Sequence, residues 1–536
     1  MAFRESTVYL YVMEENRKNK SSTLDAKSIA LLLALILGGF VRLEPVLSAK
    51  FPLKDGGLFF TFINALLQNQ FSFPDTISYN GLSIPFVYPP LSFYISALVS
   101  SLFHIPVIDL LRILPAVFSI LTIAAFYLLA KTILASDWQV CFAVLSFALL
   151  PTAIDFMIIG GGLPRALGYF FAILALQQIW LLSTQPTRRH LLGSILWVSL
   201  TVLSHPVVAK FLVYSAVLIF LFNGRNRKSL FNFCMVAAGT LLLTSPWWGL
   251  AISRHGFTPF LNALQANPHS WTSYLAVFLF MQTNEPYLHL QGFLALVGIF
   301  VCLKDKQYFL PAWLGIVFIL EPRLVASYAI LPTSLLVAIG LEALVGMLNL
   351  PQEKIPGTPN IAPSPQIERR RLSTISTILL VFFLFYSLIS AFVAAPHQYL
   401  DAENIEAMTW IKANLPKDSR FLVISGIYGA GEDYISEWFP PLSGSVSSAT
   451  PQGREWVDGS QFIDLWQSYD QLQECQYEDQ ACVENYSNTL DLKFSYIYMV
   501  KNRKSQNENP LHKNLSNNLS NALLFENSKA IIFSSK

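Results

Sequence analysis

Residues 28–47 read SIALLLALILGGFVRLEPVL, a stretch of twenty residues in which only Arg42 and Glu44 carry a charge. A helix needs about 20 mainly apolar residues to cross the hydrocarbon core of a bilayer, so this stretch predicts a membrane-spanning helix. No convincing small-residue cleavage site follows it, which argues against a cleaved signal peptide. Residues 1–27 are therefore expected to be a retained cytoplasmic segment, in which Arg17, Lys18 and Lys20 form a basic cluster before the apolar run.

The composition extends this interpretation to the whole chain. Of its 536 residues, 53% are hydrophobic and 13% are charged, whereas a soluble domain carries about 25% charged residues. So few charges cannot cover a chain of this length with polar surface, so lipid is the expected solvent for the excess apolar surface. The net charge of +2 gives no indication of a nucleic-acid partner.

Apolar runs of similar kind recur along the chain and predict a mainly α, polytopic bundle over residues 28–395, with about eleven spans. The candidates are 28–47, 113–134, 138–158, 164–183, 191–205, 206–222, 229–249, 288–303, 308–320, 325–347 and 372–395.

The basic residues give the bundle an orientation. When every basic cluster is assigned to the cytoplasm, alternate loops obey the positive-inside rule, and no other parity does so. An odd number of spans then places residues 396–536 outside, as expected for a multi-pass protein of the plasma (inner) membrane. The clusters are 17–20, 188–189, 225–228, 304–306 and 369–371.

The C-terminal region, residues 396–536, has the pattern of a small α/β domain. Residues 403–415 have the apolar spacing of an amphipathic helix, and 421–426 and 494–500 read as buried strands. Outside the cytoplasm, Cys475 and Cys482 could form a disulfide, and two free thiols are the alternative. Three cysteines fall in apolar runs and are expected to be inert packing residues: Cys141, Cys234 and Cys302.

A long outer loop, residues 48–111, separates the first two predicted spans. Its apolar residues between Phe59 and Leu67 recur at helical spacing, which predicts an amphipathic helix in the membrane interface. Pro89-Pro90-Leu91 then opens a second apolar segment, interpreted as an interfacial helix or a shallow half-span. A full span at that point is the alternative, but it would reverse the orientation of everything that follows.

Charged residues gather on the predicted outer side, where proximity to hydrocarbon makes each costly and suggests a shared site. Asp55, in Lys54-Asp55-Gly56-Gly57, is either an ordinary helix N-cap or a functional carboxylate at the membrane surface. The other residues of this set are Arg112, Asp155, Arg165, His205, Arg254, Glu285, Glu321 and Arg323. For each of these taken alone, an interfacial anchor is the simpler interpretation.

With these motifs in place, the chain resembles the GT-C class of membrane glycosyltransferases, in the branch that contains protein O-mannosyltransferases and the lipid A aminoarabinose transferase. The resemblance covers roughly residues 28–347 in architecture. The matching motifs are Asp55, Pro89-Pro90-Leu91, Arg112 before Pro115, Asp155 after Pro151, and Arg323, Tyr328 and Pro332. Trp410-Ile411 and Glu437-Trp438-Phe439-Pro440 look like the periplasmic extension of some bacterial members.

The resemblance implies transfer of a sugar from a polyprenyl-phosphate donor to an acceptor hydroxyl at the outer face of the membrane. Asp55 would be the general base and Asp155 a second carboxylate at the reacting carbon. The implied donor-binding residues are Arg323, Arg112, Arg165, His205 and Glu321, since arginine forks suit phosphate. For Glu321, an ion pair with Arg323 is the alternative. Two departures from the family pattern are Val87 and Tyr88, which stand where many members have an acid and a Lys or His.

No cofactor is implied, and no metal-ligand cluster is evident, although Asp55 and Asp155 could share a divalent cation. Membrane lipid and the lipid-linked donor are the expected partners, with an unidentified glycan, lipid or protein as acceptor. One alternative is a transporter or flippase for a lipid-linked or anionic substrate, although no internal repeat supports it. Another is a non-catalytic relative of the GT-C enzymes.

Overall fold

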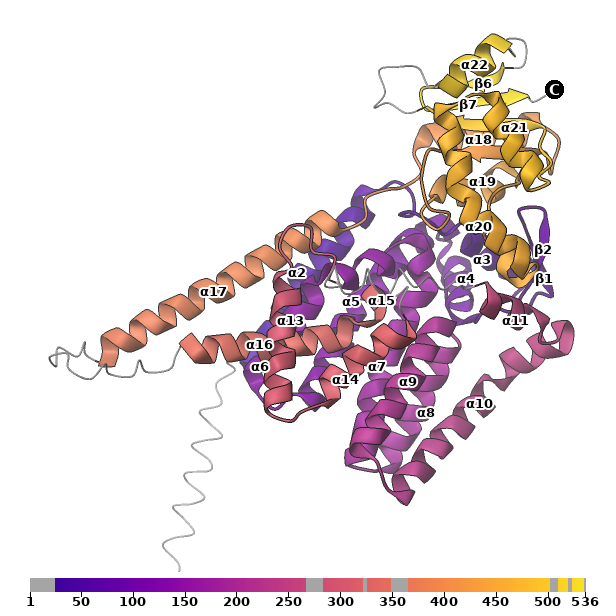
Figure 1. Cartoon of the computed structure of the whole chain (residues 1–536). Coiled ribbons are helices and arrows are strands. Elements are labelled where there is room, and N and C mark those ends of the chain that lie inside the picture. Colours follow the sequence, from indigo (N-terminus) through magenta and orange to yellow (C-terminus); the bar gives the residue numbers. More distant parts are fainter. Residues whose placement is uncertain are drawn as a thin grey trace, which may run out of the picture.

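The computed structural model describes residues 25–266, 283–321, 325–348, 365–501, 510–518 and 523–534. The chain is mainly helical, with a helical bundle and a smaller C-terminal region that contains a β-sheet (Figure 1). Within the described residues, seven segments are helical, long and apolar enough to cross a membrane. They are α2 (Ala26–Ser48), α5 (Val107–Ile133), Gly160–Thr184 including α7 (Leu163–Thr184), α9 (Pro206–Asn223), α10 (Arg227–His255), α16 (Ile330–Leu348) and Thr374–Ala394 of α17 (Pro365–Ala394).

An eighth span is possible where α6 (Asp137–Leu149) continues into Pro151–Met157 after a bend of 70°. The remaining predicted spans are also helical, but they are short. These are α8 (Arg188–Val202), α13 (Leu290–Lys304) and α14 (Phe309–Leu320), while the four-residue α15 (Val325–Tyr328) belongs to the predicted span that contains α16. The chain is thus an integral membrane protein, and the total of about eleven spans stays a prediction.

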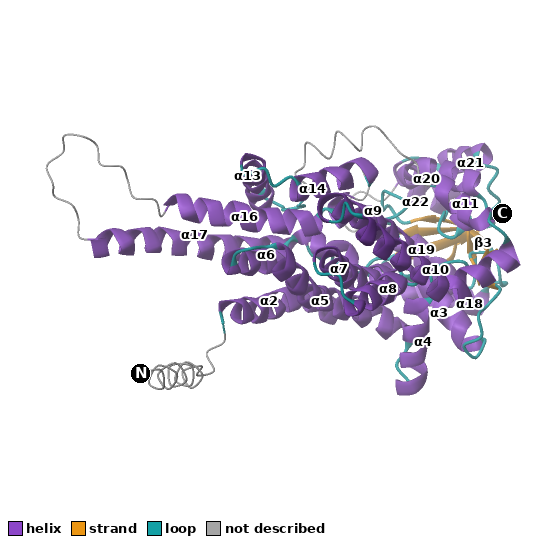
Figure 2. Cartoon of the chain, turned by 90° about the horizontal axis from the view of Figure 1, so that it is seen from below, coloured by secondary structure: helices purple, strands orange, loops and turns teal. Residues whose placement is uncertain are grey.

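The bundle packs around one large apolar core, and its outer surface is also apolar, as lipid requires. Arg42, one of the two charged residues of the first predicted span, is fully buried in this core. Its guanidinium donates to the Ser119 hydroxyl at 2.9 Å and to the Ala148 carbonyl at 2.7 Å. It therefore ties α2 to α5 and α6. Figure 2 shows α16 and α17 extending together from the bundle.

The long outer loop folds into α3 (Gly57–Gln68), a hairpin of β1 (Thr76–Tyr79) and β2 (Leu82–Pro85), and α4 (Leu91–Phe103). Asn80-Gly81 forms the hairpin turn with positive φ at both residues, a turn signal that the sequence interpretation missed. The helices have 12 and 13 residues. Neither is long enough for a full span.

The C-terminal region contains a five-stranded sheet in the order β4-β3-β5-β7-β6. β3 (Arg420–Ile424) is parallel to β4 (Val446–Ser447) and to β5 (Tyr496–Val500). β7 (Ala530–Ser534) is antiparallel to β5 and to β6 (Leu523–Glu526). Strands β3 and β5 fall on the two segments where the sequence predicts strands. The helices of this region are α18 (Ala402–Asn414), α19 (Tyr434–Ser443), α20 (Gly459–Glu474), α21 (Gln480–Thr489) and α22 (Pro510–Asn518).

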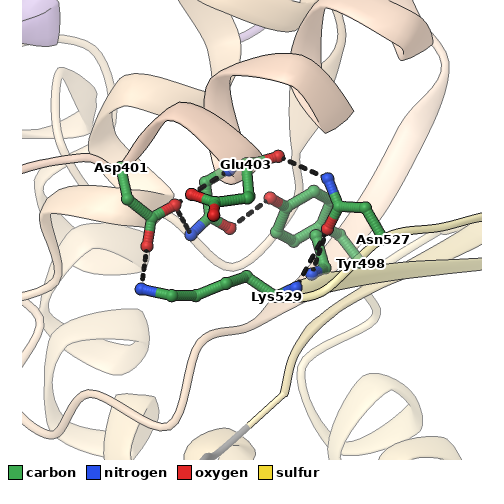
Figure 3. Close-up of polar contacts among 7 residues, drawn as sticks. Asp401, Glu403, Tyr498, Asn527 and Lys529 are labelled. Carbon is green, nitrogen blue, oxygen red and sulfur yellow. Dashed lines mark hydrogen bonds and ion pairs between the residues drawn. The ribbon is translucent and has the colours of Figure 1, made fainter.

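A polar network fixes α18 against the sheet (Figure 3). Asp401 caps α18 by accepting from the Asn404 amide at 2.9 Å, and it pairs with Lys529, the residue before β7. The Tyr498 hydroxyl of β5 donates to Asn404, and the Asn527 side chain donates to the Glu403 carbonyl at 2.8 Å. The start of α18 is therefore held on the sheet from both sides.

The outer loop and the C-terminal region share one hydrophobic core. Phe62 and Ile63 of α3 pack in the same buried cluster as Met408, Phe421 and Trp438. A bridge between Leu53 and Tyr399 adds backbone contact between the two segments. The sequence interpretation assigned the apolar face of α3 to the membrane interface. The structure corrects this: protein covers that face, because α19 and α4 pack on it.

Candidate active site

Asp55 lies in the turn between the first span and α3, and the conformation of this turn sets the direction of the Asp55 side chain. The N-cap of α3 is Gly56, with φ of 132°, and no side chain caps the helix from this position. The N-cap interpretation of Asp55 is therefore wrong. Instead its Oδ1 accepts a hydrogen bond from the Gly161 amide at 2.9 Å.

Glycine is required opposite Asp55. A Cβ on Gly161 would lie 2.3 Å from Asp55 Oδ2, and a Cβ on Gly160 would lie 2.2 Å from the Asp55 carbonyl oxygen. The Gly160 amide also donates to the Leu53 carbonyl at 2.9 Å. The glycines before α7 thus allow the backbone to approach the Asp55 turn closely and to hold its carboxylate.

Lys54 joins three acidic groups at this site. Its Nζ lies 2.9 Å from Oε2 of Glu432 and 3.8 Å from Oδ1 of Asp155, and its side chain is only 16% exposed. Burial lowers the pKa of Lys54, but the charges of Asp155, Glu432 and Asp55 outweigh that effect and raise it. Lys54 is therefore a cation at neutral pH, held among the acids.

Arg165, on the first turn of α7, brings a second cation to the site. Its Nη1 donates to the Phe156 carbonyl at 3.1 Å, and its guanidinium lies 5.6 Å from the centre of the Phe156 ring. Its charge acts on both Asp55 and Asp155. The structure therefore brings together Asp55, Asp155 and Arg165 from three separate segments.

The C-terminal region supplies a further carboxylate through α19. The Glu437 side chain is buried and accepts from the Gly56 amide at 3.2 Å and the Leu58 amide at 3.1 Å. The next residue, Trp438, donates from its indole Nε1 to the Lys54 carbonyl at 3.0 Å. Residues of α19 thus hold the backbone on both sides of Asp55, at Lys54 and at Gly56.

Two carboxyl groups of this site, those of Asp55 and Glu437, titrate above their ordinary ranges. Burial raises the pKa of Asp55, while the Gly161 hydrogen bond and the charges of Arg165 and Lys54 oppose the rise. Burial, together with the nearby charge of Asp55, raises the pKa of Glu437 to about 8. A raised pKa makes a carboxylate a stronger base at neutral pH.

Three other predicted residues, Arg112, His205 and Glu321, have partners other than Asp55. Arg112 donates to the Ala49 carbonyl at 2.9 Å and pairs with Asp109 at 3.0 Å. It therefore anchors the end of α2. Arg323 lies outside the described residues.

His205 and Glu321 also have structural partners. His205 caps α9, where its Nδ1 accepts from the Val208 amide at 3.2 Å, and its ring lies 6.2 Å from that of Tyr88. Glu321 pairs with Lys210 of α9 at 2.9 Å. A helix-capping role thus explains the position of His205, and an ion pair that the sequence interpretation did not consider explains that of Glu321.

No metal centre is evident in the part of the chain that the structure describes, where no three His, Cys, Asp or Glu side chains are arranged to bind one. Between Asp155 and Glu432 lies the Lys54 ammonium.

The sequence interpretation quoted Lys54 and Glu437 as parts of motifs but gave them no role, and it missed Glu432. A glycine run directly before Leu163-Pro164-Arg165 was the available signal for a close backbone contact.

Comparisons with known proteins give a fold but no sequence family. No family model matches the chain, and none of the curated proteins is detectably similar to it in sequence. Solved structures do match. The oligosaccharyltransferase AglB from Archaeoglobus fulgidus, in complex with an inhibitory peptide and a dolichol-phosphate, has a TM-score of 0.55 at 12% identity, over 88% of this chain and 69% of its own.

Two further structures support the same fold. ArnT from Cupriavidus metallidurans in the apo state has a TM-score of 0.53 at 12% identity, over 94% of this chain and 97% of its own. The mycobacterial arabinofuranosyltransferase AftD has a TM-score of 0.53 at 14% identity, over 95% of this chain but only 41% of its own. With the bundle, the outer-loop helices and the C-terminal region all covered, this chain has the fold of the GT-C membrane glycosyltransferases.

Proposed function

We propose that this protein transfers a sugar from a polyprenyl-phosphate donor to an acceptor hydroxyl, with Asp55 as the general base. The observation that carries the proposal is the position of the Asp55 carboxylate. It is held by the Gly161 amide, beside two cations, where the helical bundle meets the C-terminal region. Transfer from a lipid-linked phosphosugar requires a base, an adjacent anion site and a bundle embedded in lipid.

The reaction assigns a task to each group. The acceptor oxygen attacks the anomeric carbon, its proton passes to Asp55, and the bond between that carbon and the phosphate oxygen breaks. Polyprenyl phosphate then leaves with the bonding electrons. Asp155, with its side chain 22% exposed near Lys54, would stabilise positive charge that develops at the sugar carbon.

The phosphate needs cations that are fixed in place. Arg165 presents a planar fork suited to two parallel hydrogen bonds with phosphate, and Lys54 adds a point charge. Their charges reach Asp55, so a phosphate bound between them lies near the base. Such preorganised charge is often the largest single contribution to catalysis. AglB, which shares the fold, has been solved with a dolichol-phosphate, which supports a lipid-phosphate donor here.

The alternatives fit the geometry less well. A transporter would place its charged site near the middle of the membrane between repeated units. Here Asp55 lies outside the first span, and its neighbours Lys54 and Gly56 contact residues of the C-terminal region. A non-catalytic relative would have no need for a buried acid held against two glycines and between cations.

The test uses the purified full-length chain and a panel of polyprenyl-phosphate sugars, with release of polyprenyl phosphate as the signal. Asp55→Asn should abolish release while the elution profile and helical content of the protein stay unchanged. Asp75→Asn is the matched control, because Asp75 lies in the same loop with its side chain 69% exposed. Full activity in Asp55→Asn would remove this residue from the mechanism.

A further inference from the structure

The C-terminal region reaches the proposed base through one side chain, Glu437. Its two carboxylate oxygens face the amides of Gly56 and Leu58, the first and third residues after Asp55. These are amides at the start of α3 that no intrahelical carbonyl satisfies. A residue 381 positions away in the sequence therefore caps the helix that begins next to Asp55.

Contacts around Glu437 leave it little freedom. The Tyr79 hydroxyl donates to the Glu437 carbonyl at 2.8 Å, and a Cβ on Gly57 would lie 2.6 Å from that same carbonyl oxygen. The adjacent Trp438 ring packs edge-on against Phe51, with ring centres 4.7 Å apart. These contacts hold the backbone at Glu437, which leaves its carboxyl group little freedom to move.

We propose that Glu437 is the positioning residue for Asp55: it holds the turn at Gly56 and so sets the direction of the Asp55 carboxylate. This inference rests on the proposed role of Asp55 as the base. This role makes the C-terminal region part of the active site, because the N-cap residue of α3, Gly56, has no side chain to cap the helix.

The charge state of Glu437 adds a measurable signature. Burial raises the pKa of Glu437 to about 8, and the charges of the two titratable groups that face it, Asp55 and Glu455, act in the same direction. Below that pH Glu437 is protonated. Above it, Glu437 adds a negative charge near the proposed site of the donor phosphate, so binding of the donor weakens.

The first experiment separates position from charge with two variants. Glu437→Gln keeps an amide oxygen that can accept from Gly56 and Leu58 but carries no charge at any pH. We expect its activity at pH 7 to be within about twofold of the wild type, and the rise of donor KM above pH 8 to disappear. Glu455→Gln is the control, and it should retain that rise. The same alkaline rise in Glu437→Gln would overturn the charge argument.

The second experiment does not depend on transferase activity. Glu437→Leu removes both hydrogen bonds, so amide hydrogen exchange across residues 53–62 should accelerate, and kcat should fall about a hundredfold with little change in KM. If that variant does not fold, Glu437→Asp, whose shorter side chain cannot reach both amides, takes its place. Unchanged exchange in a folded variant would refute the positioning role. Faster exchange in a protein without any transferase activity would refute only the proposed function.

Discussion

At the scale of single residues, the site depends on a contact between a carboxylate and a backbone that carries no side chain. Asp55 accepts from the Gly161 amide, and its Oδ2 occupies the space where a Cβ would stand on that glycine. The position of the Asp55 carboxylate therefore depends on a glycine from a distant segment, Gly161.

Gly161→Ala is expected to displace Asp55 and to lower kcat by about a hundredfold, since a shift of 1 Å at a reacting group has that effect. The added methyl group would lie 2.3 Å from a carboxylate oxygen. Steady-state kinetics with the active donor measures the loss. The matched control is Gly249→Ala in α10, where no atom lies within 4 Å of the new methyl group. Equal activity in both variants would contradict the assigned contact.

The proposed role of Asp55 as the base predicts an acidic limb in the pH dependence of activity. Burial raises the pKa of Asp55 above its ordinary value of 3.8. A general base acts when ionised, so activity is present above this raised pKa and is lost as pH falls through it. We expect kcat/KM to fall on acidification well before an ordinary aspartate would be protonated. A profile flat down to pH 4 would argue against Asp55 as the base.

At the scale of elements, α19 and α3 form a unit across the boundary between the outer loop and the C-terminal region. The apolar face of α3 predicts a surface that must be covered, and hydropathy alone cannot distinguish lipid from protein as its cover. In the structure the cover is α19, whose Trp438 and Phe439 are buried in the shared core. Contact with α19 therefore explains why α3 lies beside the site.

A second link within the C-terminal region is the disulfide between Cys475 and Cys482, which joins the end of α20 to α21. Closing a loop of this length stabilises the folded state by about 2 kcal/mol in the chain-entropy account. We expect reductant to lower the apparent unfolding temperature of the wild type in detergent. The Cys475→Ser/Cys482→Ser variant should start lower and not respond to reductant. An equal response in both proteins would exclude the disulfide as the cause.

At the scale of the whole molecule, the arrangement requires the C-terminal region to lie on the same side of the membrane as the outer loop, because the two share a core. The basic clusters predict that this is the outer side. We propose the same placement for residues 396–536, with the N-terminal segment in the cytoplasm.

Cysteine labelling tests this placement. Thr409→Cys, exposed on α18, and Gln185→Cys, exposed at the end of α7, are compared in a background where Cys141, Cys234 and Cys302 are replaced. In intact cells, a membrane-impermeant maleimide should label the first position and not the second. Labelling of Gln185→Cys alone would invert the topology, and the shared core would then place the outer loop inside as well.

The sequence by itself determined the membrane class, the helical segments and the group of charged residues from which the site is drawn. These are local properties, because a run of apolar residues must avoid water whatever else the chain does. Only the tertiary structure decided that Asp55 faces Gly161 and is flanked by Glu437 and Lys54, while Arg112 and Glu321 pair elsewhere. Apart from the pair of Arg112 with Asp109 in its own helix, those contacts join segments more than a hundred residues apart. No spacing along one segment encodes which distant partner will satisfy a hydrogen bond or a charge.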